Sequence, residues 1–105
     1  MRRGEIWWAN LPSPVGRRPV LLLSRDTAYQ VRTSLTVAAI TRTIRHIPVE
    51  VSLEAEDGMF EKCVVNLDES MTIPKSLLTE PITTLSSQKM ALVDKAISFA
   101  LDIDM

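Results

Sequence analysis

The chain has 105 residues, of which 46% are hydrophobic and 24% are charged. This size and composition suit a compact hydrophobic core, and we expect a single domain over residues 1–105. No run of about 18 apolar residues occurs, and no apolar N-terminal stretch precedes a small-residue cleavage site, so we expect neither a membrane-spanning helix nor a secretory signal. We therefore expect a cytoplasmic protein that does not bind membranes.

The formal net charge of −1 hides a strong division of charge along the chain. Residues 1–48 hold all eight arginines against two acidic residues, a formal +6, whereas residues 49–105 hold four lysines against eleven acidic residues, a formal −7. If the first half folds onto one side, its guanidinium groups form a positive face that attracts phosphates. The alternative is that these arginines are scattered over the surface.

Short apolar and β-branched runs with turn residues between them predict a mainly β fold. The predicted strands cover residues 5–11, 19–24, 35–41, 48–53, 63–67 and 70–73. Prolines and Gly16 in the segment 12–16 predict a turn between the first two strands, with Gly16 free to adopt a positive φ. The second and third runs are continuously apolar, so we expect them at the centre of the sheet, covered on both faces.

The later segments predict an exposed strand, a turn and a helix. The strand at 48–53 alternates apolar and polar residues, which indicates one wet face, and a turn follows at 56–58. After Ser86, a predicted N-cap, the apolar residues adopt a helical period with a broad face that includes Leu92 and Phe99. Because the polar stripe is narrow, we expect a homodimer contact to cover part of this face. A sheet of five or six strands that curls into a small barrel, with a C-terminal helix, accommodates all of these elements.

Most residue patterns of known catalytic sites are absent, including Gly-rich phosphate loops, GxSxG, HExxH and CxxC. His46 is the only histidine and cannot supply the paired acid and base of a histidine-dependent ribonuclease, so we interpret it as a surface residue. Cys63 lies in an apolar run and is interpreted as a buried residue rather than a nucleophile. Glu54, Glu56 and Asp57 have no completing ligand nearby, which favours a solvated turn over a metal site. No metal or cofactor is expected.

Polar residues at the ends of two apolar strands remain as candidates for catalysis. Arg17 and Arg18 directly precede the second predicted strand, and Thr41 and Arg42 end the third. If these strands are adjacent and antiparallel, Arg18 and Thr41 meet at one edge of the sheet. RNA brings its own nucleophile, the 2′-OH, so an enzyme must only orient it, remove its proton and neutralise the phosphorane. An always-protonated arginine suits the last task, and Thr41 suits a hydrogen-bonding role rather than that of a base.

Trp7 and Trp8 are neighbours in the first predicted strand and therefore point to opposite faces. One should enter the core, while the other faces solvent, a partner subunit or a nucleobase. Stacking on a base contributes ~1–3 kcal/mol, although we favour structural packing for the outer tryptophan.

Five segments resemble, in order and spacing, the conserved blocks of the MazF/PemK-type toxins of type II toxin-antitoxin systems. They are RGEIWWANLP at 3–12, GRRPVLLLS at 16–24, TVAAIT at 36–41, VVNLDE at 64–69 and LSSQKMALVDKAI at 85–97. The resemblance covers nearly the whole chain and implies an SH3-like barrel, of the type shared with CcdB-like plasmid-maintenance toxins, with a C-terminal helix. It also implies a homodimer, a cognate antitoxin, and metal-free cleavage of single-stranded RNA or mRNA that leaves 2′,3′-cyclic phosphate and 5′-hydroxyl ends.

Carried over by position, the resemblance makes Arg18 and Thr41 the catalytic pair. In relatives the first loop contacts RNA and gates the groove, which implies an RNA contact for Ser13. This loop is short here and has no counterpart of the general base that it carries elsewhere, so the identity of the base stays open.

The resemblance also places Asp68 and Glu69 in the RNA groove. Glu69 departs from the amide that the family often has at this position, a change that can alter base preference. With Arg17 and Arg42 as further contacts to the RNA, these residues complete the expected substrate-binding set.

Two other functions are compatible with the same pattern. A CcdB-like protein poisons gyrase without enzymatic activity, but members of that family act through a C-terminal tryptophan segment, whereas this chain ends LDIDM at 101–105. An inactive RNA-binding barrel would keep the basic half without the chemistry. For the toxin, the expected partner is a MazE-like antitoxin whose disordered acidic C-terminal segment lies across the arginine-rich groove.

Overall fold

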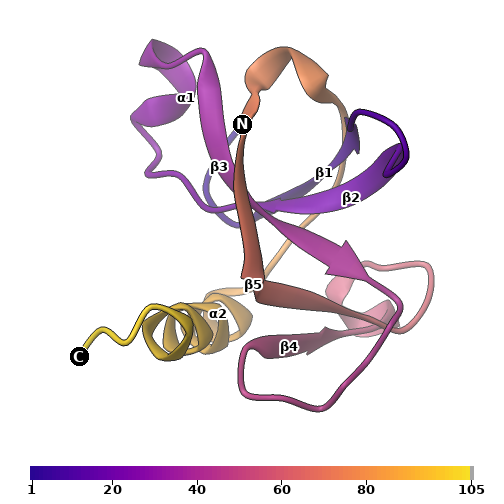
Figure 1. The fold of residues 1–105 in the computed structure, drawn as a ribbon, viewed down its shortest axis with the longest axis vertical. Coiled ribbons are helices and arrows are strands. Elements are labelled where there is room, and N and C mark those ends of the chain that lie inside the picture. Colours follow the sequence, from indigo (N-terminus) through magenta and orange to yellow (C-terminus); the bar gives the residue numbers. More distant parts are fainter. Residues whose placement is uncertain (105) are drawn as a thin grey trace.

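The computed structural model describes residues 1–104 and arranges them as one antiparallel sheet with two α-helices and two 3-10 turns (Figure 1). In chain order the elements are β1 (Glu5–Asn10), β2 (Arg17–Leu22), α1 (Ala28–Val31), β3 (Ser34–Thr41), β4 (Glu50–Leu53), η1 (Ala55–Asp57), β5 (Cys63–Pro74), η2 (Lys75–Leu77), β6 (Leu78–Thr84) and α2 (Ser87–Ala100). Met105, the last residue of the expected domain, lies outside the described residues. The strand order is β4-β5-β3-β2-β1-β6, which confirms the central positions predicted for β2 and β3.

The sheet buries apolar side chains on both faces, in two separate core clusters. Leu21 of β2 packs in the first cluster together with Val93 of α2. Its neighbour Leu22 packs in the second cluster together with Tyr29 of α1. In Figure 1, α2 lies beside β4 and β5 at one end of the sheet, and α1 lies beside β3 at the other. Two-sided burial explains why β2 and β3 read as continuous apolar runs.

β5 is one strand of 12 residues rather than the two strands predicted at 63–67 and 70–73. Its register against β3 shifts so that residues 67–69 have no partner there and form a bulge. Because the shift is an odd number of residues, it reverses which face each side chain takes. Val65 therefore packs in the first cluster and Ile73 in the second, although both have odd numbers.

The sequence does not predict β6, which forms one edge of the sheet and pairs with β1. Pro81 interrupts its strand pattern, and a proline lacks the N–H group that a central strand needs. An edge strand tolerates this loss, because one side of its backbone has no neighbour to bond. The four-residue helix α1 is also unpredicted, since it is too short to show a helical period.

Two other predictions of local structure are confirmed. In β4, Val51 and Leu53 are buried and Ser52 is exposed, which is the predicted alternation. The Ser86 hydroxyl accepts a hydrogen bond from the Lys89 backbone N–H at 3.1 Å and caps α2.

Between its edge strands β4 and β6 the sheet is open, so it forms a curled half-barrel with a C-terminal helix, in line with the expected small barrel. The exposed fractions of Leu92 and Phe99 are 52% and 62%, so the sheet leaves part of the apolar face of α2 uncovered, as predicted. No helix in the described part of the chain is long and apolar enough to cross a membrane.

Candidate active site

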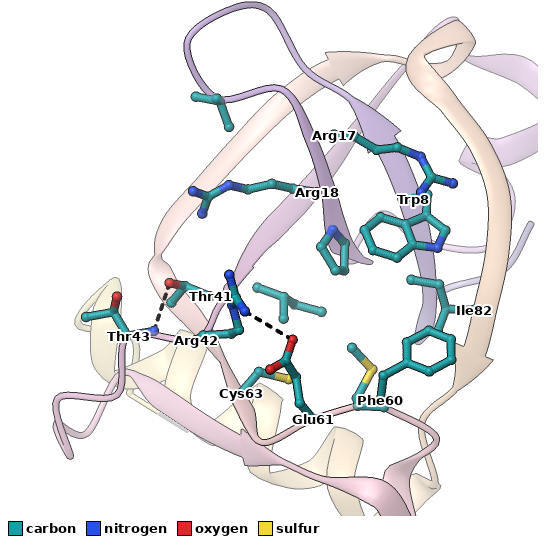
Figure 2. A pocket seen from close by; sticks show the side chains of 14 residues that line it. Trp8, Arg17, Arg18, Thr41, Arg42, Thr43, Phe60, Glu61, Cys63 and Ile82 are labelled. Atoms are coloured by element: carbon teal, nitrogen blue, oxygen red, sulfur yellow. Dashed lines mark hydrogen bonds and ion pairs between the residues drawn. The ribbon is translucent and has the colours of Figure 1, made fainter.

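A cavity of about 500 Å³ lies where β2 begins and β3 ends (Figure 2). The segment between η1 and β5 forms its opposite wall. Its lining residues are Trp8, Val15, Arg17, Arg18, Pro19, Ile40, Thr41, Arg42, Thr43, Met59, Phe60, Glu61, Cys63 and Ile82. Figure 2 shows that Arg18, Thr41, Arg42 and Glu61 occupy one side of the cavity, whereas Trp8, Phe60 and Ile82 occupy the other. The cavity therefore has a polar side and an aromatic, apolar side.

The register of the central strands brings Arg18 and Thr41 to the same place. β2 and β3 are antiparallel, and their last recorded pair on this side is Val20 with Ala39. The same register, extended by two residues, sets Arg18 opposite Thr41. The turn before β2 is closed by Gly16, whose φ is +72° and whose carbonyl oxygen accepts a hydrogen bond from the Leu11 N–H. The meeting of these two strand ends is as the sequence predicted.

Arg18 is the cavity arginine without an acidic partner among the described residues. It is half-buried, and within residues 1–104 its guanidinium group has neither an acidic partner nor a hydrogen bond. Because a guanidinium group stays protonated at any ordinary pH, Arg18 presents a permanent positive charge to the cavity. An anionic group that enters the cavity can therefore pair with the Arg18 guanidinium group.

The Thr41 hydroxyl is oriented by the backbone that follows β3. Its oxygen accepts a hydrogen bond from the Thr43 N–H at 3.1 Å. A hydroxyl has one hydrogen to donate, and this contact leaves that hydrogen free. Thr41 is therefore set up to donate a hydrogen bond into the cavity rather than to take a proton.

Arg17 serves the aromatic side of the cavity. Its guanidinium carbon lies 4.2 Å from the centroid of the Trp8 ring, and its Nη2 is paired with the Glu80 carboxylate of β6. A cation over an indole face contributes about 0.5–1 kcal/mol at an exposed site, and the two contacts hold the indole ring and the guanidinium group together. Trp8 is thus the outer tryptophan. Trp7, on the opposite face, packs against the second core cluster.

Arg42 faces a carboxylate across the mouth of the cavity. Its Nη1 lies 3.3 Å from Oε1 of Glu61, and both side chains are largely exposed. Such a pair is weak in water and opens easily. Two of the three cavity arginines therefore have acidic partners from the second half of the chain, and among residues 1–104 Arg18 has none.

Cys63 lines the cavity but is 3% exposed, which confirms its prediction as a buried residue. Burial, together with the nearby carboxylates Glu61 and Asp57, raises the pKa of the thiol. The sulfur therefore stays protonated and is a poor nucleophile. His46 is exposed and lies outside the cavity lining, as expected of a surface residue.

The predicted acidic turn is present, but Asp57 is not the solvated residue that the sequence suggested. Its side chain is 9% exposed, accepts a hydrogen bond from the Glu54 N–H at 3.0 Å and lies 3.5 Å from the Lys89 ammonium of α2. The helix thereby anchors the segment that carries Phe60 and Glu61. Within residues 1–104, no three His, Cys, Asp or Glu side chains gather closely enough to hold a metal ion.

A family model described as a PemK-like, MazF-like toxin of type II toxin-antitoxin systems matches residues 2–101. The chain belongs to this toxin family. It is 41% identical over 91 residues to a protein from Mycobacterium tuberculosis named "Probable endoribonuclease MazF2", which covers 86% of this chain and 87% of that protein. It is also 37% identical over 112 residues to "Endoribonuclease MazF" from Staphylococcus saprophyticus, which covers 98% and 92%.

Solved structures of MazF-like toxins have the same fold. The Mycobacterium tuberculosis toxin MazF-mt6 superposes with a TM-score of 0.89 at 35% identity, covering 96% of this chain and 99% of that one. A mycobacterial endoribonuclease in complex with its cognate antitoxin has a TM-score of 0.89 at 22% identity, covering 100% and 98%, and is similar in fold alone. The names of these relatives favour the endoribonuclease interpretation over the gyrase-poisoning one.

The MazF/PemK-like cavity includes four of the seven site residues expected from the sequence and omits three. Ser13 is exposed in the first turn and lies outside the lining. Asp68 and Glu69 are exposed in the β5 bulge, where the Asp68 N–H donates to the Asn66 side-chain oxygen at 2.9 Å. Roles for these three residues in binding remain predictions.

The cavity also contains residues that the sequence interpretation did not single out, chiefly Phe60 and Glu61. Phe60 is 84% exposed, the largest exposed fraction among the large apolar side chains of the described residues. Only the placement of the segment after Gly58 brings these residues to Arg18 and Thr41. An aromatic residue beside an acid in a turn is too common a pattern to have identified them.

Proposed function

We propose that this toxin is a sequence-selective, metal-independent endoribonuclease that cleaves single-stranded RNA through its 2′-OH at Arg18 and Thr41. The main observation that supports this proposal is that two groups lie in one cavity of a MazF/PemK-like chain. They are the unpaired guanidinium group of Arg18 and the hydroxyl of Thr41, which is oriented to donate a hydrogen bond. The products are a 2′,3′-cyclic phosphate and a 5′-hydroxyl. The toxin domain spans residues 1–105 and acts in the cytoplasm.

Each of the two residues has a distinct task in this reaction. Attack of the 2′-oxygen on phosphorus gathers negative charge on the non-bridging phosphate oxygens. Arg18 neutralises that charge, and the Thr41 hydroxyl donates a hydrogen bond to one of the same oxygens. Because the cavity fixes both groups before the substrate arrives, little reorganisation is needed when the charge develops.

The aromatic side of the cavity supports binding of an unstacked base beside the scissile phosphate. Trp8, held by Arg17, and the exposed ring of Phe60 offer flat surfaces on which a base stacks, which is how proteins usually hold single-stranded RNA. Arg42 binds a neighbouring phosphate once its pair with Glu61 opens. Ser13, Asp68 and Glu69 are proposed to contact the RNA farther along the strand.

The partners follow from the family and from the uncovered surfaces. The exposed apolar residues Leu92 and Phe99 favour a homodimer through α2. A MazE-like antitoxin with an acidic C-terminal segment is the expected inhibitor, since a carboxylate at Arg18 blocks the phosphate position. This attraction between unlike charges predicts weaker association at high salt, measured by calorimetry over a range of ionic strengths. Affinity that does not change with salt would instead indicate a mainly apolar interface.

The proposed function is tested by a single 2′-deoxy substitution at the scissile nucleotide of an oligonucleotide substrate. Cleavage should stop at that position, because the nucleophile is missing, while the same oligonucleotide with a 2′-deoxy group two nucleotides away is still cut. Undiminished cleavage at the deoxy position would rule out the 2′-OH mechanism. Both reactions contain EDTA. A substrate that is cleaved without EDTA but not with it would contradict the metal-independent part of the proposal.

A further inference from the structure

The reaction proposed above needs a proton acceptor, and few groups of the cavity can serve. Its titratable side chains are Arg17 and Arg18 from β2, Arg42 after β3, Glu61 before β5, and Cys63 at the start of β5. A guanidinium group is permanently charged at ordinary pH, so the arginines can stabilise charge but cannot remove a proton from a hydroxyl. The choice narrows to Glu61, Cys63 and the hydroxyl groups.

The other groups are poorly placed or in the wrong protonation state. Cys63 is buried, and burial keeps its thiol protonated. The Thr41 oxygen already accepts the Thr43 N–H, and a threonine hydroxyl is too weak a base to act alone. The first loop, with Pro12, Pro14 and Val15 around Ser13, offers no basic or acidic side chain.

Glu61 is the carboxylate among the lining residues of the cavity. Its carboxylate is 61% exposed and lies beside the strand end that carries Thr41 (Figure 2). Arg42 contacts Oε1 at 3.3 Å, while within residues 1–104 Oε2 takes part in no hydrogen bond or ion pair and is open to an incoming hydroxyl. The pair of Asp57 with Lys89 fixes the segment from which Glu61 projects.

We propose that Glu61 is the general base that accepts the proton of the RNA 2′-OH. This inference rests on the proposed endoribonuclease function and deepens it. Glu61 takes the proton, the 2′-oxygen bonds to phosphorus, and the bond between phosphorus and the 5′-oxygen breaks. The leaving 5′-oxygen takes a proton from water in the open cavity, and Glu61 returns its proton to solvent, so the step consumes no net proton and no electron. The pair with Arg42 holds the carboxylate until RNA displaces that arginine onto a phosphate.

Single-turnover cleavage by Glu61→Gln tests the proposal, with Glu56→Gln as the matched control. Glu56 is an exposed glutamate of the same segment, and removing its charge alters the overall charge in the same way. General base catalysis contributes about 10²- to 10⁴-fold, so the cleavage rate of Glu61→Gln should fall by that factor with RNA affinity within about threefold. Glu56→Gln should cleave at the normal rate. In Glu61→Ala, added formate should restore part of the rate, because the open cavity admits a small carboxylate.

The competing explanation gives the opposite result. If Glu61 merely neutralises Arg42, then Glu61→Gln frees a cation, tightens RNA binding and leaves the cleavage rate intact; this outcome overturns the proposal. If Glu61→Gln fails to fold, judged by circular dichroism and melting temperature, Glu61→Asp decides. A folded Asp variant with cleavage well above that of Glu61→Ala supports a base, and equal rates for the two oppose it. A wild-type protein that cleaves no RNA overturns both this inference and the proposed function, whereas active wild type with an unaffected Glu61→Gln overturns this inference alone.

Discussion

Two hollows of similar size in the described part of the chain differ in their lining. The cavity of about 500 Å³ at the ends of β2 and β3 contains three arginines and a carboxylate. The groove of about 470 Å³ between β4 and α2 is bordered by the apolar residues Leu92, Ala96 and Phe99, with Glu50, Lys89 and Lys95 among its other lining residues. In the first hollow, Thr41 makes a hydrogen bond and Arg17 and Arg42 make ion pairs, whereas Arg18 has no partner among residues 1–104. In the second, large apolar side chains face solvent without cover. The first suits an anionic substrate and the second suits a protein surface, so we expect catalysis and assembly to use different parts of the molecule.

Among the variants that distinguish the cavity from the groove, we expect Arg18→Ala to have the largest effect on the cleavage rate. In Arg18→Ala the cavity loses its uncommitted cation, and cleavage should slow by about 10²- to 10³-fold, the usual result of removing one group that stabilises an oxyanion. The melting temperature should stay unchanged, because Arg18 makes no ion pair among residues 1–104. Arg32→Ala, which removes an exposed arginine outside the cavity lining, should cleave normally. Equal losses in both variants would mean that general charge, not the cavity, drives catalysis.

The next effect tests whether the segment beside the cavity depends on its anchoring. Gly58 has a φ of +93°, and a Cβ there would lie 2.3 Å from the Thr83 hydroxyl oxygen. Gly58→Ala should therefore destabilise the protein by about 2–4 kcal/mol, from backbone strain and overpacking together, and should slow cleavage because Phe60 and Glu61 shift. Gly16→Ala also introduces a side chain at positive φ, but its Cβ meets nothing within 4 Å, so it should cost only about 1–2 kcal/mol in chemical denaturation. Equal losses for the two would show that the close contact with Thr83 adds nothing to the strain at Gly58.

The smallest expected effect lies in the groove. Phe99→Ser removes an exposed aromatic ring of α2 and should weaken dimerisation about tenfold, as measured by sedimentation equilibrium, while the cleavage rate of the dimer stays the same. Val31→Ser is the matched control, because Val31 is also an exposed apolar residue but lies on α1, away from the groove. A monomeric wild type, or a control that dissociates as readily as Phe99→Ser, would show that this groove is not the dimer contact.

Local sequence patterns predicted the parts of the cavity that depend on strand pairing. The two continuous apolar runs had to be central strands, and antiparallel pairing of neighbours then brought Arg18 and Thr41 together. The β5 bulge was visible only as a gap between two predicted strands. β6 was not predicted, because Pro81 interrupts its strand pattern. For the same reason the position of Ile82 in the cavity lining was not predicted.

The part of the cavity that the sequence did not predict depends on contacts between segments that are distant in the chain. Phe60 and Glu61 reach the site because Asp57 pairs with Lys89 and its carbonyl oxygen accepts the Thr83 hydroxyl at 3.2 Å. These links span 32 and 26 residues, and no local period encodes them. Asp68 and Glu69 illustrate the reverse case, since resemblance alone nominated them and the bulge keeps them out of the cavity lining.

The most direct measurement of the central claim is mass spectrometry of the products that the purified protein makes from a defined single-stranded RNA in EDTA. A cavity that uses Arg18, Thr41 and the 2′-OH of the substrate predicts one fragment with a 2′,3′-cyclic phosphate and one with a 5′-hydroxyl, and neither fragment with Arg18→Ala over the same time. Fragments with 3′-hydroxyl and 5′-phosphate ends would contradict the account, because that chemistry uses water rather than the 2′-OH as nucleophile.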